Sequence, residues 1–567
     1  MNWFAATKTS ARINRLAIAI CTLGVWLLPA ITHGSDLQGM VASVNPLATQ
    51  AGLNALKSGG NAIDAAIAVG LTLGVVDTHN SGIGGGCFML IHLADGKNIC
   101  IDGREMAPAA ATRDMFVRAG KGDTDLSQNG PLASGVPGEL AAFDYADKNY
   151  GKKTLRDLIL PAATIAENGY KFDRISARLL TSVATNMEKY PGATGVFFKD
   201  GQPVKAGELL KQPDLATTYR AIADQGVDWF YHGPFAASVG NWMAANDGIL
   251  TSNDFAGYHI EVRDPIETTY RGYTVVSFPP PSSGGVHVLE MLNILEHFDL
   301  KPMDEVTRFH VIAEAMKLAF ADRAYWLGDP EFVNVPRGLI SKEYAAGLAK
   351  KINPTNAIVV ASHGLPPDWQ TDVFKKHTTH FCTADAAGNW VSCTATINTS
   401  FGSKVVVPGT GVVLNDEMDD FSTQAGVPNH FGLVGADANS VAPGKRPLSS
   451  MSPAIVFKNG QPVIALGAAG GPKIITAVLL ELVDLLDLGM SPTQALAAPR
   501  IHEQWVPDEL FVESKFPDPL RTALAQRGHK IEVLPAEAIS QIIARSPDGQ
   551  GFIGAADPRA NGKAQGW

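Results

Sequence analysis

The sequence changes character abruptly at residue 378. The segment from 365 to 376 is polar and contains Pro366, Pro367 and two adjacent lysines, which predicts a loop. Two runs rich in β-branched and apolar residues follow, 378–384 and 390–398, with Ala387-Gly388 between them. This pattern predicts two strands joined by a tight turn. The chain must therefore build a sheet in which one strand begins at Thr378.

A two-residue turn at Ala387-Gly388 fixes which residues of the two strands face each other. It predicts that Thr396 lies opposite Thr379 and beside Thr378. It also predicts Cys382 opposite Cys393, where either a disulfide or a packed pair of thiols fits the spacing.

The rest of the chain alternates helix-rich and strand-rich blocks, which indicates layered sheets covered by helices. The region from 130 to 350 is predicted to be mostly helical. Before it we expect two helices, Pro46–Lys57 and Ala62–Val75 capped by Asn61, and a hairpin of Cys87–Leu93 with Asn98–Ile101. After it we expect strands at Gly411–Leu414 and Ala454–Phe457 that extend the sheet, another strand at Pro462–Leu466, and a helix at Ile474–Leu488.

Composition limits the possible partners. The chain has 567 residues, 46% of them hydrophobic, so a large core is assured. Its formal net charge of -10 comes without any long basic run, which argues against nucleic acid binding and favours a small-molecule partner.

The N-terminus has the pattern of a secretory signal. Lys8, Arg12 and Arg15 precede an apolar run from 16 to 30 that is short for a bilayer span. We expect cleavage between residues 31 and 35, and export; a retained membrane anchor is the alternative. The remaining cysteines, Cys87, Cys100, Cys382 and Cys393, are too few for a disulfide framework, so buried free thiols are the simpler interpretation.

Thr378 is a candidate nucleophile if cleavage makes it N-terminal. A free α-amino group has a pKa of about 7.7 to 8.0 and can act as the general base for its own hydroxyl. Thr396 on the paired strand can supply a second hydroxyl. Taken alone, these are ordinary strand threonines.

Four further segments contain side chains or backbone groups that could bind a substrate or stabilise a reaction intermediate. The carboxylates of 415–421 can hold an ammonium group or a divalent cation, or form a solvated acidic turn. Arg104 can grip a carboxylate through two bonds. The turn 467–473 matches no nucleotide-binding spacing, but its backbone N–H groups can stabilise an oxyanion. The serines of 447–453 can bind a carboxylate or close a turn. Together they suit an amide substrate with an amine and a carboxylate, such as a γ-glutamyl group.

In these segments the sequence resembles the γ-glutamyltransferase (glutathione hydrolase) family of N-terminal nucleophile hydrolases. The resemblance covers nearly the whole mature chain and rests on ordered motifs: GMVAS from Gly39, GGNAIDAAIAVG from Gly59, REMAPA from Arg104, PPPSSGG from Pro279, TTH from Thr378, NDEMDDF from Asn415, KRPLSSMSP from Lys445, and AAGGP from Ala468.

The resemblance implies an α+β fold, a four-layer αββα sandwich formed jointly by two autoproteolytic subunits. After a signal peptide at 1–34, the large subunit spans 35–377 and the small catalytic subunit 378–567, and the two stay associated. The resemblance implies that Thr378 is the nucleophile, that Thr396 assists it, and that Gly470 and Gly471 form the oxyanion hole. It also implies that the α-carboxylate of the γ-glutamyl group is bound by Arg104, Ser449 and Ser450, and its α-amine by Asn398, Glu417 and Asp420.

The implied reaction transfers the γ-glutamyl group of glutathione or another γ-glutamyl compound to Thr378, then to water or to an amino acid or peptide acceptor. No cofactor or metal is implied. Residues 424–437 correspond to a lid, in which Phe431 stands where many bacterial members have tyrosine. The alternatives are a glutaryl-cephalosporin acylase, a γ-linked polyglutamate depolymerase, or a non-catalytic zwitterion-binding protein.

Overall fold

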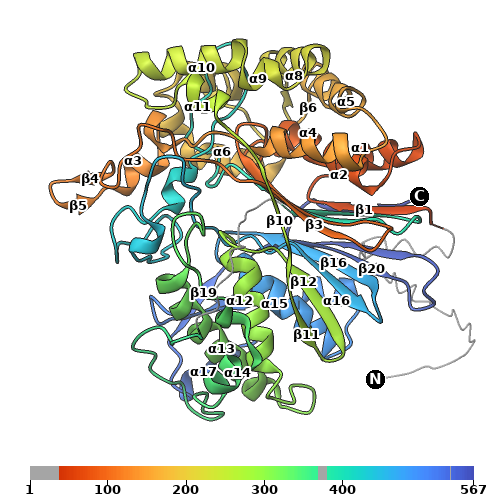
Figure 1. Cartoon of the computed structure of the whole chain (residues 1–567), viewed down its shortest axis with the longest axis vertical. Helices are drawn as coiled ribbons and strands as arrows, with labels where there is room; N and C mark the ends of the chain where they lie inside the picture. Colours follow the sequence, from red (N-terminus) through yellow and green to blue (C-terminus); the bar gives the residue numbers. More distant parts are fainter. Residues whose placement is uncertain (1–36, 368–379, 537) are drawn as a thin grey trace, which may run out of the picture. The chain divides into compact units, whose positions relative to one another are not determined.

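Two large sheets form the centre of the protein (Figure 1). The computed structural model describes residues 37–367, 380–536 and 538–567. Every pairing within the two sheets is antiparallel. The first sheet has the order β10-β3-β2-β14-β13-β1-β22, with bounds β1 Gly39–Ser43, β2 Gly86–His92, β3 Asn98–Gly103, β10 Glu261–Arg263, β13 His380–Asp385, β14 Trp390–Thr396 and β22 Lys563–Gly566. The second has the order β11-β12-β15-β16-β20-β21, with bounds β11 Ile266–Tyr270, β12 Tyr273–Ser277, β15 Ala454–Lys458, β16 Gln461–Ala469, β20 Ile539–Arg545 and β21 Phe552–Ala556.

Helices cover the outer face of each sheet. Those on the first sheet are α1 Pro46–Lys57, α2 Ala62–Val76, α4 Glu139–Tyr150, α5 Leu155–Asn168 and α8 Pro213–Gln225. Those on the second are α12 Ser283–Leu295, α13 Glu305–Trp326, α14 Lys342–Ala349 and α15 Lys473–Leu486. Shorter or peripheral helices are α3 Thr124–Gln128, α6 Arg174–Met187, α7 Pro191–Phe197, α9 Asp228–Tyr231, α10 Pro234–Ala245, α11 Ser252–Ala256, α16 Pro492–Ala497 and α17 Asp518–Gln526.

The two sheets pack face to face through a third apolar cluster. Phe88 of β2 stacks on Phe278, which follows β12, with ring centroids 4.3 Å apart. Alternation along the strands sends one set of side chains into this layer and the other set toward the helices. The four-layer αββα arrangement expected from the motifs is therefore confirmed.

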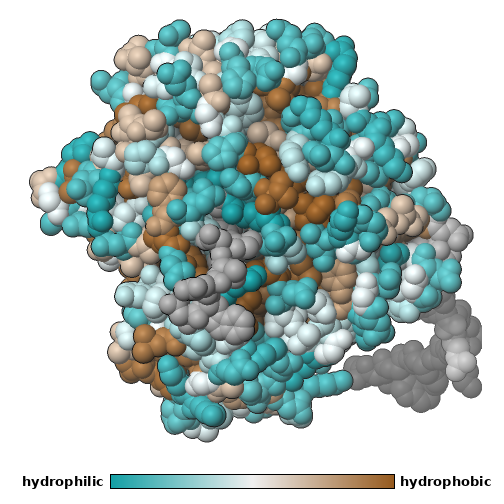
Figure 2. Space-filling view, viewed as in Figure 1, coloured by the Kyte–Doolittle hydropathy of each residue, from teal (hydrophilic) through white to brown (hydrophobic). Residues whose placement is uncertain are grey.

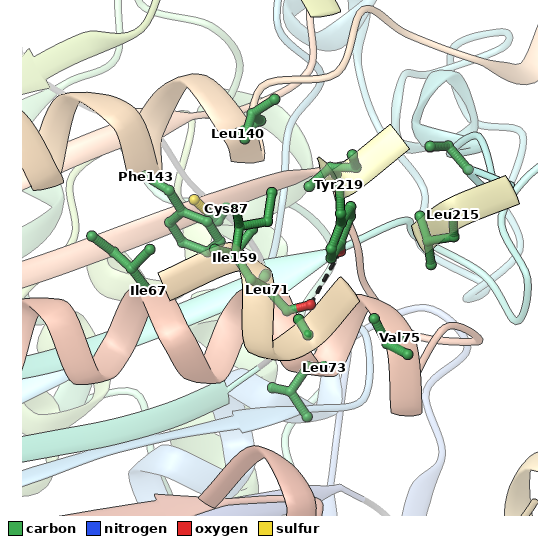
Figure 3. Packing of buried hydrophobic residues seen from close by; sticks show 14 of the residues in the cluster. Ile67, Leu71, Leu73, Val75, Cys87, Leu140, Phe143, Ile159, Leu215 and Tyr219 are labelled. Carbon is green, nitrogen blue, oxygen red and sulfur yellow. Dashed lines mark hydrogen bonds between the residues drawn. The ribbon is translucent and has the colours of Figure 1, made fainter. Parts of the chain in front are cut away.

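The early helices form where their caps predict. Asn61 and Asp64 make a capping box at the start of α2, as the Asn61 cap predicts. Every residue of α2 is buried, and the phenol of Tyr219 in α8 donates a hydrogen bond of 3.1 Å to the carbonyl oxygen of Leu71 (Figure 3). This bond ties α8 to α2 above the first sheet.

The predicted register of the β13–β14 hairpin is wrong by one residue. Asp385 N–H donates to Asn389 O, so the turn contains three residues and Gly388 adopts a φ of 103°. Consequently Cys382 lies opposite Ser392, and Cys393 lies opposite Phe381. A one-residue shift reverses the faces of a strand. Cys382 therefore packs between the sheets and Cys393 under the helices, and all four described cysteines are free thiols.

Two other strand predictions need correction. Residues 411–414 join neither sheet. Val413 makes only an isolated antiparallel bridge with Val406, beside which Leu414 N–H donates to Val405 O. The strands at 454 and 462 exist, but they belong to the second sheet and do not extend the sheet of β13. Between β14 and β15 the chain forms loops and two short 3₁₀ helices, and it enters the second sheet only at β15.

Both sheets combine strands from either side of residue 378. β13 and β14 lie between β1 and β2 in the first sheet, and β12 pairs with β15 in the second. Neither the part of the chain before residue 378 nor the part after it can form either sheet alone.

The surface is mainly polar on the face shown in Figure 2, where apolar residues form patches interrupted by hydrophilic ones. Within residues 37–367, 380–536 and 538–567, no helix is both long and apolar enough to cross a membrane. The predicted signal segment lies outside these ranges.

Candidate active site

A cavity of about 200 Å³ opens where β14 and β16 end. Its walls come from distant parts of the sequence: Asn80, Thr396, Asn398, Thr399, Ser400, Asp420, His430, Phe431, Ser450, Ala469, Gly470 and Gly471. Seven of the residues singled out from the sequence are in this set.

Thr396 is the last residue of β14 and is held by the turn that follows. Its Oγ1 accepts a hydrogen bond of 2.7 Å from the N–H of Asn398. Asn398 has a φ of 72°, and its side-chain Nδ2 donates to Asp416 O at 2.9 Å. Because the Thr396 oxygen acts as acceptor, its own proton remains available to a second group. Thr378 lies outside the described residues; His380, two positions later, begins β13 and pairs with Thr394 of β14.

The acidic segment is buried, so its interpretation as a solvated turn is wrong. Residues Glu417–Asp420 form a short 3₁₀ helix, and the guanidinium of Arg104 lies against it. Arg104 Nη1 donates to Glu417 and, at 3.3 Å, to Glu105, while Nη2 donates to Asp420 at 2.7 Å and Nε to Pro447 O at 3.3 Å. Four of the five guanidinium N–H groups are thereby used.

Electrostatics couple these four side chains. Burial disfavours the charge of Arg104, but Glu417, Glu105 and Asp420 more than offset burial and raise the pKa of its guanidinium. Burial also raises the pKa of Glu105 to about 7 and that of Glu417 well above its usual range, although Arg104 acts in the opposite direction on both. Arg104 is thus a charge partner of the carboxylates predicted to hold an amine.

Of the two adjacent serines, Ser450 lines the cavity and Ser449 does not. Ser449 is 1% exposed, and its hydroxyl has no hydrogen-bond partner among the described residues. Ser450 accepts a hydrogen bond of 3.3 Å from Arg323 Nη2. Arg323, near the end of α13, was not foreseen from the sequence.

The glycine-rich turn connects β16 to α15. Gly470 has a φ of 142° and Gly471 a φ of 60°, backbone conformations that residues other than glycine rarely adopt. The two glycines line the cavity just before α15 begins, and backbone N–H groups at a helix start suit a developing oxyanion.

Phe431 lies over this turn. A Cβ placed on Gly471 would be only 2.6 Å from the Phe431 ring. The backbone of Phe431 is held by Asn429 Oδ1, which accepts its N–H at 3.1 Å, and by Gln504 Nε2, which donates to its carbonyl at 3.4 Å. The aromatic ring thus covers one side of the cavity without a phenol oxygen.

Five cavity residues were not singled out beforehand: Asn80, Thr399, Ser400, His430 and Ala469. Asn80 begins the glycine-rich loop before β2, and Thr399 and Ser400 directly follow Asn398, so adjacency to known motifs was a usable signal. Conversely, Arg104, Glu417 and Ser449 lie behind the cavity wall. Arg104 joins this group to the cavity by donating to Asp420, and Ser449 directly precedes the lining residue Ser450.

Within the described ranges, one group of side chains has metal-binding potential. His310, Glu314 and His529 are buried, and their ligand atoms lie within 4.8 Å of one another. However, His310 Nδ1 and His529 Nε2 share a hydrogen bond of 2.7 Å, and the Lys317 ammonium lies 3.5 Å from Glu314. These contacts pair the rings and the carboxylate with protein groups, and none of the three residues lines the cavity.

An αββα sandwich with hydroxyl, carboxylate and glycine backbone groups gathered at the strand ends defines an N-terminal nucleophile hydrolase. The family model described as gamma-glutamyltranspeptidase matches residues 48–567. The chain is 44% identical to the glutathione hydrolase proenzyme of Escherichia coli, over 92% of this chain and 90% of that protein. It therefore belongs to the γ-glutamyltranspeptidase family, as its motifs predict.

Acylases are also similar to this chain. It is 39% identical to the acylase ACY 1 proenzyme of a Pseudomonas species, over 93% of both chains. It superposes on the crystal structure of a cephalosporin acylase from Bacillus halodurans with a TM-score of 0.85 and 32% identity, over 97% of this chain and 99% of that one.

Proposed function

We propose that the protein is a γ-glutamyltransferase and glutathione hydrolase that cleaves γ-glutamyl amides through an ester on Thr378. The observation that carries this proposal is the single cavity in which Thr396, Asn398, Asp420, Ser450, Gly470 and Gly471 meet. These residues come from separate sequence segments, and each has a role in binding or cleaving an amide that bears both an amine and a carboxylate.

The first step transfers the acyl group to the enzyme. Thr378 Oγ1 attacks the γ-carbonyl carbon while the α-amino group of Thr378 takes the hydroxyl proton. Thr396 steadies the attacking oxygen, and the N–H groups of Gly470 and Gly471 bind the oxyanion. As the C–N bond breaks, the proton passes to the leaving amine, which for glutathione is cysteinylglycine.

The second step frees the acyl group. Water or the amine of an amino acid or peptide loses a proton to the same α-amino group and attacks the ester carbonyl. The ester C–O bond breaks, Thr378 recovers its proton, and the product is glutamate or a new γ-glutamyl amide. The chain's own residues supply every proton acceptor in this scheme.

Charge complementarity fixes the substrate's orientation. Glu417 and Asp420, with the amide of Asn398, are suited to the α-ammonium group, and the hydroxyls of Ser449 and Ser450 to the α-carboxylate. Arg104, which bonds to Glu417 and Asp420, is proposed to bind the α-carboxylate together with the two serines.

Maturation is part of the proposal. Removal of a signal at 1–34 and cleavage before Thr378 would give chains of 35–377 and 378–567, exported to the periplasm or secreted. The position of β13 and β14 between β1 and β2 supports a heterodimer that stays associated, since separation would break both sheets. Residues 424–437, with Phe431 over Gly471, are proposed as a lid.

The acylases are the second candidate because they share the fold over nearly the whole chain. A glutaryl group lacks the α-amine and would leave the carboxylates of Glu417 and Asp420 without their ligand. We expect kcat/KM for γ-glutamyl p-nitroanilide to exceed that for glutaryl p-nitroanilide by at least about tenfold, because hydrogen bonds to charged groups contribute about 1.5–3 kcal/mol. A preference for the glutaryl compound would assign the protein to the acylases.

A further inference from the structure

A second cavity, of about 210 Å³, adjoins the first. Asn80 and Ala469 line both cavities. The first opens where β14 ends, whereas Val44 and Asn45, which directly follow β1, line the second. Because β13 lies between β14 and β1 and runs antiparallel to both, the two cavities flank the start of β13. The residues proposed to hold the γ-glutamyl group belong to the first cavity or lie behind its wall, so they leave the second one free.

A chain of hydrogen bonds beside the second cavity fixes the side chain of Asn80. Asp173 accepts from the hydroxyl of Ser176, so Ser176 Oγ can itself accept from His79 Nδ1 at 3.2 Å. A neutral His79 with its proton on Nδ1 has a lone pair on Nε2, which accepts from Asn80 Nδ2 at 3.1 Å. The same Nδ2 also donates to Asp77 Oδ2 at 3.1 Å.

This orientation leaves the side-chain carbonyl oxygen of Asn80 free. The amide nitrogen carries two protons, and Asp77 and His79 use both. Oδ1 accepts no hydrogen bond from any residue in the described ranges. Asn80 is half-buried and lines both cavities, so it can offer this oxygen to an N–H group of a ligand where the cavities meet.

Arg178 brings an unpaired positive charge to the second cavity. It lies on α6, and its guanidinium makes no hydrogen bond or ion pair with any of the described residues. The two carboxylates that line this cavity have other partners. Asp173 accepts from two N–H groups at the start of α6, and Asp77 accepts from Asn80. A guanidinium with all five donors free is suited to the carboxylate of a ligand.

We infer that the second cavity binds the leaving group of the acyl donor, with Asn80 Oδ1 accepting from the scissile N–H and Arg178 pairing with the leaving group's carboxylate. This inference rests on the proposed function, in which the leaving group of glutathione is cysteinylglycine. An amino acid or peptide acceptor uses the same cavity in the second step, because it must attack from the side that the leaving group has vacated. Asn80 and Arg178 are thus specificity-determining residues for the amine part of the substrate.

Glutathione and its C-terminal amide test the role of Arg178. The amide lacks only the negative charge at the end of the leaving group. In Arg178→Gln, the ratio of kcat/KM for glutathione to that for the amide should fall about 3- to 10-fold from the wild-type value, a modest effect because the guanidinium is exposed to solvent. Arg178→Lys should keep most of the ratio. Release of glutamate measures both donors, and the ratio is independent of how much of each preparation is active.

Arg174→Gln is the matched control. Arg174 is an exposed arginine one turn earlier on α6, and it lines neither cavity. This variant should keep the wild-type ratio. An unchanged ratio in Arg178→Gln, or an equal fall in Arg174→Gln, would overturn the inference while leaving the proposed function intact.

γ-Glutamylalanine and the γ-ester of glutamate with lactic acid test the role of Asn80. In the ester an oxygen replaces the scissile N–H, so the substrate has no proton to give to Asn80 Oδ1. Asn80→Ala should therefore lower kcat/KM for the amide about 3- to 10-fold more than for the ester, since one neutral hydrogen bond is lost. Equal losses with the two donors would also overturn the inference.

Two outcomes are kept apart from these. If Asn80→Ala gives no soluble, cleaved protein, the ratio measured with Arg178→Gln decides alone, because that variant changes an exposed side chain without partners. A wild-type protein that releases glutamate from none of the four donors would instead remove the proposed function itself.

Discussion

Replacing Thr378 with alanine is expected to leave the protein as one uncleaved chain without measurable γ-glutamyl hydrolase activity. The substitution removes the oxygen that attacks the chain during maturation and the substrate during turnover. Loss of the nucleophile of a serine hydrolase costs about 10⁶-fold in kcat, and a loss of similar order is expected here. A denaturing gel and an assay with γ-glutamyl p-nitroanilide measure both effects on one preparation.

Thr378→Ser is the matched control, because it keeps the hydroxyl and removes only a methyl group. It should still be cleaved and should retain activity well above that of the alanine variant. An alanine variant that is cut and active would show that another residue is the nucleophile.

Replacing Gly470 with alanine should lower kcat about 10²- to 10³-fold with little change in KM. Gly470 has a φ of 142°, where a Cβ introduces strain, so the turn must shift to accept one. Such a shift would move the N–H groups that we propose bind the oxyanion, and the oxyanion develops its charge only on the way to the tetrahedral intermediate. Steady-state kinetics with the γ-glutamyl anilide separate the two parameters.

Gly460→Ala controls for backbone strain alone. Gly460 occupies the turn between β15 and β16 with a φ of 76°, and an added Cβ would meet no atom within 4 Å. This variant should lose some stability and keep its kcat. If Gly470→Ala matched wild-type kcat, the glycine turn would have no part in stabilising the oxyanion.

Much of the fold could be predicted from local sequence patterns, such as helix caps, and these are present in the structure. Asn61 and Asp64 mark the start of α2 because their side chains satisfy helix N–H groups within a few residues. The β13–β14 register did not follow, since a third turn residue shifts every pair and the sequence around Gly388 fits a two- or three-residue loop. Sheet membership of β15 and β16 was also missed, because it depends on contacts with β12 and β20 that are far away in the sequence.

In the candidate active site, too, some residues could be predicted from the sequence and others could not. Motifs identified Thr396, Asp420 and Gly470, each of which lines the cavity. They gave no sign that Arg104 is already paired with the carboxylates, nor that Arg323 of α13 reaches Ser450. Pairing between charges depends on tertiary distances, which the sequence pattern of a single helix does not give.

N-terminal sequencing of the smaller band from purified wild-type protein tests the central claim most directly. The account predicts two bands and a small chain that begins Thr378-Thr379-His380, since only cleavage at that bond gives the nucleophile a free α-amino group. A single uncleaved chain, or a small chain that begins at any other residue, would contradict it.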